Sequence, residues 1–203
     1  MKPILFILLF QSCLVDCFAQ KTITNYMENQ NINYGSLSWL PAHYGFYGQE
    51  FEFSKKVDLN SFSIYIYHVP NQDETKSTIN YSIWSFDSIP EKELFLSEPV
   101  NVTANDVNNW KKFQFKAPLK LPKGKYLFAV GQSKNQGFVA FGNGYAKDNY
   151  HSTFWVKAPV EGFSDGTNWF DMIKFEKSFD TSLTDEQKQK MNQSVVMMRI
   201  EYK

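Results

Sequence analysis

The stretch Leu59–Val69, LNSFSIYIYHV, decides the fold class. Its apolar and aromatic residues alternate with polar residues at a period of two, which is typical of a β-strand. Within it, Ile64–Tyr67 is apolar on both faces, which predicts a central strand covered from both sides. Outward from this stretch the same pattern predicts further strands at Gln49–Phe53, Thr78–Phe86, Trp110–Phe115, Lys125–Gly131, Gly137–Phe141, Ser152–Lys157 and Ser194–Tyr202.

Turn-forming residues separate these strands. They form the runs Pro70-Asn71-Gln72-Asp73, Ser88-Ile89-Pro90, Pro122-Lys123-Gly124, Gly142-Asn143-Gly144 and Ser164-Asp165-Gly166. Such runs favour chain reversal. About eight strands with short connections and no helical crossovers predict an all-β, antiparallel, jelly-roll-like sandwich. We expect a single domain over residues 20–203.

The alternation also indicates which side chains face the core. One face of the last strand carries Val196, Met198, Ile200 and Tyr202, and one face of the Lys125–Gly131 strand carries Tyr126, Phe128 and Val130. A single segment departs from the β pattern. Thr184–Met191, TDEQKQKM, begins with an N-cap residue followed by two acids, which predicts a short helical insertion before the last strand.

The N-terminus has the layout of a secretory signal peptide over residues 1–19. Lys2 precedes the apolar run ILFILLF, and the small residue Ala19 precedes Gln20. Cleavage after Ala19 would remove both cysteines, Cys13 and Cys17. An alternative is lipid attachment at Cys13. Either way we expect the mature protein outside the cytoplasm: secreted, periplasmic or on the cell surface.

The charge balance argues against nucleic acid as a partner. The 203 residues carry 21 basic and 21 acidic side chains, and Arg199 is the only arginine. Nucleic-acid binding normally uses a basic field and guanidinium groups. Beyond the N-terminal run, no apolar stretch approaches the ~20 residues that a membrane helix needs.

No motif for catalysis is present. The three histidines, His43, His68 and His151, accompany no G-x-S-x-G or H-E-x-x-H sequence. Glu50 and Glu52 share one strand face, but two acids on one strand do not make the opposed pair that glycoside hydrolysis needs. We therefore expect no enzyme and no cofactor, with Ca²⁺ at the loop acids Asp148 and Asp165 as the one metal hypothesis.

Aromatic residues in turn-rich segments are the strongest remaining signal. Flat rings beside amides and carboxylates suit carbohydrate, because the ring meets sugar C–H groups while the polar groups meet hydroxyls. Core packing is the competing interpretation for each ring. The predicted ligand-binding residues are Tyr44, Tyr47, Tyr145, Tyr150, His151, Trp155 and Trp169.

The order of these segments resembles a known type of domain. The residues that carry the resemblance are Ile83–Asp87, Trp110–Phe115, Gly124–Val130, Gly137–Gly142, Trp155 and Val195–Ile200. From about Leu59 to the end, the chain is similar in outline to the galactose-binding-like and carbohydrate-binding β-sandwich modules of secreted bacterial proteins. The resemblance implies an accessory or adhesive role and no catalytic residues.

Three functions are consistent with the sequence. The first is an exported, non-catalytic module that binds a glycan or a cell-surface partner. The second is a structural or assembly component of a bacterial cell envelope, which would pair through a strand edge or an apolar patch. The third is a polysaccharide-active enzyme.

Overall fold

The computed structural model describes residues 20–28, 45–132, 139–147, 154–160, 164–171, 184 and 194–203. These residues form strands joined by turns, with two short 3-10 turns. The strands are β1 (Lys21–Thr24), β2 (Phe46–Phe53), β3 (Val57–Tyr67), β4 (Thr78–Phe86), β5 (Pro90–Leu96), β6 (Val100–Asn101), β7 (Asn109–Leu121), β8 (Gly124–Gln132), β9 (Ala140–Phe141), β10 (Asn143–Tyr145), β11 (Phe154–Lys157), β12 (Pro159–Val160), β13 (Ser164–Asp165), β14 (Phe170–Asp171), β15 (Ser194–Val196) and β16 (Met198–Tyr202). The 3-10 turns are η3 (Glu74–Lys76) and η4 (Ala104–Asp106).

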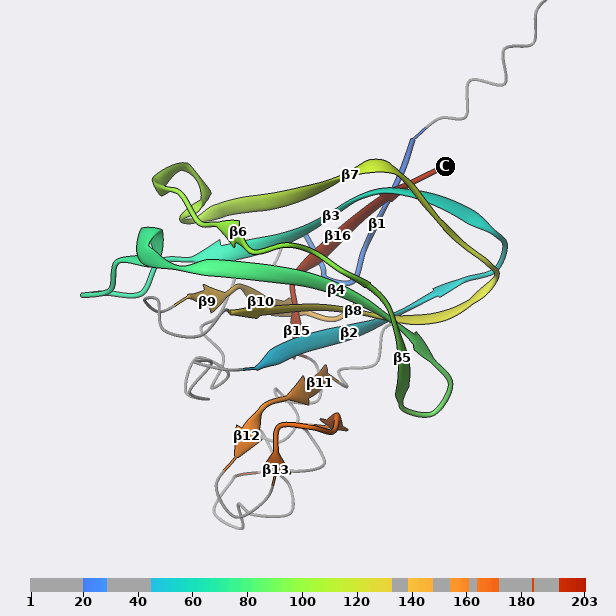
Figure 1. Cartoon of the computed structure of the whole chain (residues 1–203). Coiled ribbons are helices and arrows are strands. Elements are labelled where there is room, and N and C mark those ends of the chain that lie inside the picture. The colour runs from blue at the N-terminus through green and yellow to red at the C-terminus, as the bar shows by residue number, and fades with distance from the viewer. Residues whose placement is uncertain are drawn as a thin grey trace, which may run out of the picture.

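Two large antiparallel sheets make up most of the described fold, beside the two-stranded pairs β10-β15 and β12-β13. The five-stranded sheet has the order β1-β16-β3-β7, with β9 also paired to β3. The seven-stranded sheet has the order β14-β11-β2-β8-β4-β5, with β6 also paired to β4. Figure 1 shows the two sheets packed face to face, with β7, β3 and β16 in one layer and β4, β8 and β2 in the other. The all-β sandwich predicted from the sequence is confirmed.

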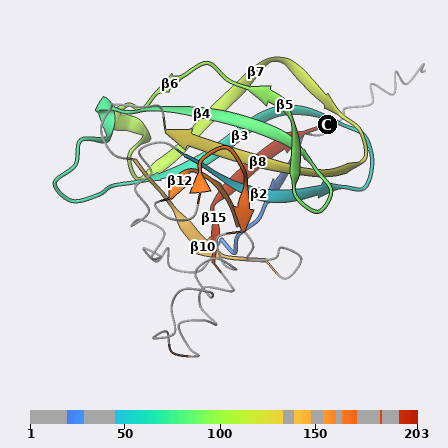
Figure 2. The ribbon, with the colours of Figure 1, turned by 60° about the horizontal axis from the view of Figure 1, so that its bottom comes forward.

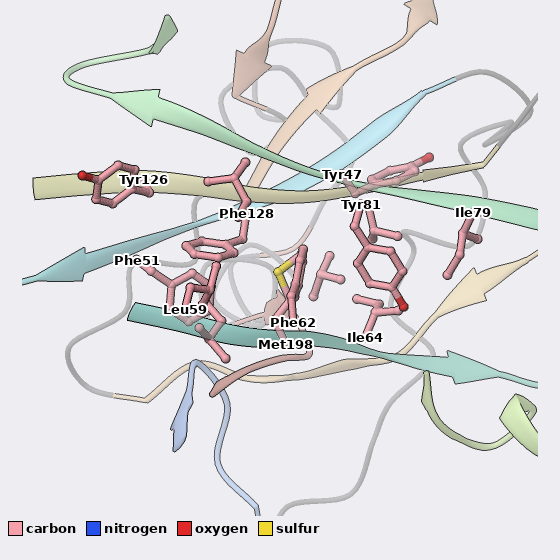
Figure 3. Packing of buried hydrophobic residues seen from close by; sticks show 14 of the residues in the cluster. Tyr47, Phe51, Leu59, Phe62, Ile64, Ile79, Tyr81, Tyr126, Phe128 and Met198 are labelled. Atoms are coloured by element: carbon pink, nitrogen blue, oxygen red, sulfur yellow. The ribbon is translucent and has the colours of Figure 1, made fainter. Parts of the chain in front are cut away.

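Large aromatic side chains fill the space between the sheets. Phe62 on β3 projects between Tyr81 on β4 and Phe128 on β8, and its ring centroid lies 5.1 Å and 5.3 Å from theirs. All three are fully buried, and Figure 3 shows them with Ile64 and Met198 around them. Edge-to-face pairs of this kind add to the free energy gained by burying the rings. This packing holds the two sheets together.

The predicted inward faces of two strands are confirmed. Residues 196, 198 and 200 of the last strand and residues 126, 128 and 130 of β8 belong to the core, and Tyr202 packs against it. The last strand itself is interrupted. Met197 separates β15, which pairs with β10, from β16, which pairs with β1 and β3, and its N–H donates to the carbonyl of Gly142 at 2.8 Å. A change of partner strand therefore breaks a segment that alternates without interruption in sequence.

Strand boundaries were less predictable. The strand expected at Trp110–Phe115 continues through Pro118 to Leu121 as β7. Proline is tolerated there because β7 lies at the edge of its sheet and its pairing with β3 shifts register between Leu59 and Ser61. Strand β5, PEKELFL, lacks alternation and was not predicted. It too lies at an edge, with one described partner strand, β4.

Two predicted segments lie wholly or almost wholly outside the described part of the chain. These are the signal peptide over residues 1–19 and the short helix expected from Thr184 to Met191, of which Thr184 alone is described and lies in neither a helix nor a strand. Across the described residues, no helix has the length and apolar character required to cross a bilayer.

Candidate ligand-binding face

The outer face of the seven-stranded sheet carries a group of aromatic side chains. Along β4, Tyr81 and Ile83 point into the core. Because successive side chains on a strand point to opposite faces, Trp84 and Phe86 project outward. They meet Trp155 of β11 and Trp169 on the same outer side, where these rings pack with Phe46, Leu127 and Ala129. We call this set the aromatic face.

Small residues make room for Trp155 on this face. Cross-strand pairing aligns Ser82, Ala129, Gly48 and Trp155 in one row across β4, β8, β2 and β11. A Cβ atom added at Gly48 would lie 2.7 Å from the side chain of Leu127, so no larger residue fits there without a shift. Trp155 is only 6% exposed to solvent. It forms the floor of the aromatic face.

Hydrogen bonding and ring packing orient Trp155. Its indole Nε1 donates to Oε1 of Glu50 at 2.8 Å. The ring of Phe86 packs edge-on against it, with 5.5 Å between centroids. Glu50 thus helps to position Trp155 on this face.

A second part of the aromatic face forms around Trp84. Its Nε1 donates to the Ser82 hydroxyl at 3.1 Å, and its ring lies edge-to-face with Trp169 at 5.5 Å between centroids. The Nζ atom of Lys157 lies 4.6 Å from the centre of the Trp84 ring. Trp84, Phe46, Phe86 and Trp169 are partly buried, so each leaves some ring surface exposed.

The segment between β11 and β14 brings Trp169 to the outer face, where it contacts Trp84. Strands β12 and β13 pair with each other, and Gly166 then adopts a positive φ of 82°, which glycine tolerates without strain. The chain next pairs with β11 through β14, where Val156 is opposite Phe170. Figure 2 shows β12 in front of β8 and β2, on the outer side of the seven-stranded sheet.

Two polar groups of this face have no oxygen partner among the described residues. The Nε1 atom of Trp169 is buried, and it meets no acceptor in the described part of the chain. Lys157 makes its ring contact with Trp84 but forms no ion pair or hydrogen bond with any described residue. A buried donor without an acceptor costs roughly 1–3 kcal/mol of stability.

The acids on this face show no arrangement for metal binding. Within residues 20–28, 45–132 and the shorter described segments, no three His, Cys, Asp or Glu side chains come together as metal ligands would. The structure does not test the hypothesis that Asp148 and Asp165 bind Ca²⁺. Asp148 lies outside the described residues, and only the backbone of Asp165, in β13, is described.

The structure places the predicted binding residues in different surroundings. Trp155 and Trp169 both belong to the aromatic face. Tyr47 points the other way, into the core, where it is 4% exposed, and burial raises the pKa of its hydroxyl well above the ordinary value. Tyr145 is partly buried in β10, a strand that pairs with β15 and belongs to neither large sheet. Tyr44, Tyr150 and His151 lie outside the described residues.

Sequence reasoning missed Trp84, Phe86 and Lys157 as candidate binding residues. The signal was present in the strand Thr78–Phe86, because its inward residues Tyr81 and Ile83 imply an outward Trp84 and Phe86. The proximity of Lys157 to Trp84 could not be predicted, since β2 and β8 separate their strands in the sheet.

An exposed apolar patch continues this face to the sheet edge. Leu96 pairs with Ser82 across β4 and β5, so it shares the outer side, and it is 48% exposed. Leu94 and Ile89 of the same hairpin are also exposed. No protein-family model and no curated protein sequence matches this chain.

Proposed function

We propose that the protein is an exported, non-catalytic binding module that recognises carbohydrate on the aromatic face. One observation carries the proposal. Three tryptophans and a phenylalanine from β4, β11 and the chain before β14 converge on the outer side of one sheet, and most of them stay partly exposed. Indole and phenyl rings that serve only the core would lie between the sheets.

The chemistry of the face suits a sugar. Aromatic rings contact the C–H faces of pyranose rings, and nearby polar groups bind hydroxyls. Trp84 and Phe86 supply ring surface, and the partly exposed Glu50 supplies carboxylate oxygens, one of which accepts from the indole N–H of Trp155. Covering the remaining exposed ring surface contributes roughly 25 cal/mol per Å² of apolar area.

The test is a glycan-array screen of the purified protein, with and without Ca²⁺, followed by single variants. Trp84→Ala and Trp169→Ala should each weaken binding of a retained glycan by about tenfold or more, which is the loss expected for an interaction of about 1.4 kcal/mol. Trp110→Ala is the matched control. That tryptophan is also partly buried, but it lies on the outer face of the five-stranded sheet and packs on Tyr26 and Tyr65.

The outcomes separate a binding role from a packing role. Binding that survives both aromatic-face variants, or that is lost equally in Trp110→Ala, would exclude the aromatic face as the glycan site. Circular dichroism of each variant confirms that it is folded before its affinity is compared.

A second candidate function is assembly with another protein of the cell envelope. The exposed side chains of Ile89, Leu94 and Leu96 favour it, because apolar groups clustered at a sheet edge often mark a protein-binding surface. A blank array from folded protein, together with co-purification of a partner that is lost in Leu94→Ser and Leu96→Ser, would favour this candidate over carbohydrate binding.

A further inference from the structure

Lys157 differs from the other partly buried lysines of the described chain. Lys111 donates to Oδ2 of Asp106 at 2.8 Å, and Lys147 donates to the hydroxyl of Thr24. Lys157 has no such oxygen partner within the described part of the chain, where its contact is the ring of Trp84. The remaining described lysines are exposed, where water supplies the acceptors.

The contact with Trp84 positions the Lys157 ammonium but does not provide hydrogen-bond acceptors for its N–H groups. A cation over an indole is attracted to the ring face, but the ring accepts no directed hydrogen bond of the kind that an oxygen accepts. An ammonium has three N–H donors, and no described residue accepts a hydrogen bond from those of Lys157. A ligand that approaches this side of Trp84 therefore meets a positive charge.

A second donor lies beside the same ring. The buried Nε1 of Trp169 belongs to a ring 5.5 Å from that of Trp84, and no described residue accepts its hydrogen. Two side chains that contact the Trp84 ring therefore carry N–H groups with no acceptor among the described residues. Of the two, the partly exposed ammonium of Lys157 is the one that suits a ligand group with acceptor oxygens and a negative charge.

The acids of this face do not neutralise Lys157. Glu50 accepts from Trp155, and cross-strand pairing puts Glu52 opposite Lys125, Asp171 opposite Trp155 and Glu93 opposite Trp84. None of them forms an ion pair with Lys157. Their negative charges oppose a dense polyanion, which favours a sugar that carries isolated acidic groups.

We infer that the ligand of the aromatic face is an acidic saccharide that presents a carboxylate or sulfate oxyanion to Lys157. The inference rests on the proposed carbohydrate-binding function and specifies its ligand class. The contact is charge-assisted, so its contribution should fall as salt is added.

Matched saccharides test the inference with the unaltered protein. The probes are lactose, 3′-sialyllactose and 3′-sulfolactose, together with trigalacturonate and its methyl ester, measured by calorimetry at low and high salt. At least one acidic member should bind roughly tenfold or more tightly than its neutral counterpart, and added salt should reduce the difference. The sialyl and sulfo forms distinguish a carboxylate from a sulfate.

Variants assign the preference to one side chain. Lys157→Met removes the charge and keeps the apolar stem, so it should abolish the preference for the acidic member, whereas Lys157→Arg should retain most of it. Lys125→Met is the control, because Lys125 is an exposed lysine on the same outer face.

The two proposals fail in different ways. Neutral and acidic members that bind equally, in the unaltered protein and in Lys157→Met, would overturn the acidic ligand and leave the carbohydrate site standing. An equal loss in Lys157→Met and Lys125→Met would overturn the role of Lys157. Absence of binding to every saccharide of both the panel and the array would overturn both proposals.

Discussion

The two outer faces of the sandwich both bear tryptophan next to a cation, yet they treat their polar groups differently. On the five-stranded sheet, Arg199 lies over Trp110 at 4.0 Å, and its Nε donates to the Tyr26 hydroxyl at 2.8 Å. On the seven-stranded sheet, Lys157 lies over Trp84 at 4.6 Å and has no oxygen partner among the described residues. Arg199 is therefore held by both a ring and a hydroxyl, whereas among the described residues Lys157 contacts a ring alone.

Other polar groups of the two sheets can be compared in the same way, by whether each has a hydrogen-bond partner. Beside Arg199, Glu201 accepts from both Lys112 and Ser61, so neighbouring charges are paired. On the outer face of the seven-stranded sheet, the described chain leaves the buried Nε1 of Trp169 without a partner, while the two other such atoms of this sheet belong to the inward-facing Tyr47 and Gln49. In the five-stranded sheet, Asp58 Oδ1 is such an atom. The paired charges indicate that the first outer face serves stability, whereas Lys157 on the second has no oxygen partner among the described residues.

The largest expected effect compares the two cations. Arg199→Met should lower the free energy of unfolding by about 2 kcal/mol, because it removes the ring contact and a hydrogen bond that involves a charge. Lys157→Met should lower it by less than about 1 kcal/mol, because only the ring contact is lost. Urea unfolding monitored by tryptophan fluorescence measures both. Equal losses would contradict the division between the faces.

A smaller effect compares two tyrosine hydroxyls. Tyr26→Phe should cost about 1 kcal/mol, because Arg199 loses its acceptor. Tyr47→Phe should leave stability unchanged or raise it by up to about 1 kcal/mol, because the hydroxyl it removes is buried without a described partner. Chemical denaturation at neutral pH compares the pair. A clear loss in Tyr47→Phe would show that this hydroxyl has a partner in the folded protein.

The smallest effect is a pH dependence on the five-stranded face. Burial raises the pKa of Glu201, but hydrogen bonds from Lys112 and Ser61 lower it by more, so the pKa lies below its ordinary value of 4.5. The unfolded chain therefore binds the proton more readily than the folded chain. The stabilisation is complete above the unfolded pKa and is lost as the pH falls through the folded pKa.

Variants of the same pair measure this contribution. Glu201→Gln and Lys112→Met should each flatten the loss of stability below pH 4.5, by less than about 1 kcal/mol since the pair is partly exposed. Unfolding midpoints in urea across this pH range follow the change. A slope that is the same in both variants and the unaltered protein would show that this ion pair does not contribute to acid sensitivity.

Local alternation was sufficient to predict the main strands and their inward faces. Phe128 and Val130 of β8, and Met198 and Ile200 of β16, lie in the core as the period of two indicates. The period failed where pairing, rather than burial, ends or extends a strand. Met197 interrupts a continuous pattern because its neighbours pair with different strands, and β7 passes Pro118 because an edge strand can bulge.

The candidate site was predictable only in part. Trp155 and Trp169 were chosen because they are aromatic and close to turns, and both lie on the aromatic face. Tyr47 satisfied similar criteria in sequence and lies in the core. One position along a strand changes the face of the sheet, and the register that sets it depends on distant partners.

The sequence by itself determined an antiparallel β-sandwich, because the faces of its strands are encoded by neighbouring residues two positions apart. Only the tertiary structure decided which aromatic residues meet. Trp84, Lys157 and Trp169 come from separate strands and turns, and their contacts depend on the sheet order and on the return of the chain to β11. Sheet order is a property of long-range pairing, which no local pattern specifies, so the candidate ligand site emerged only from the folded chain.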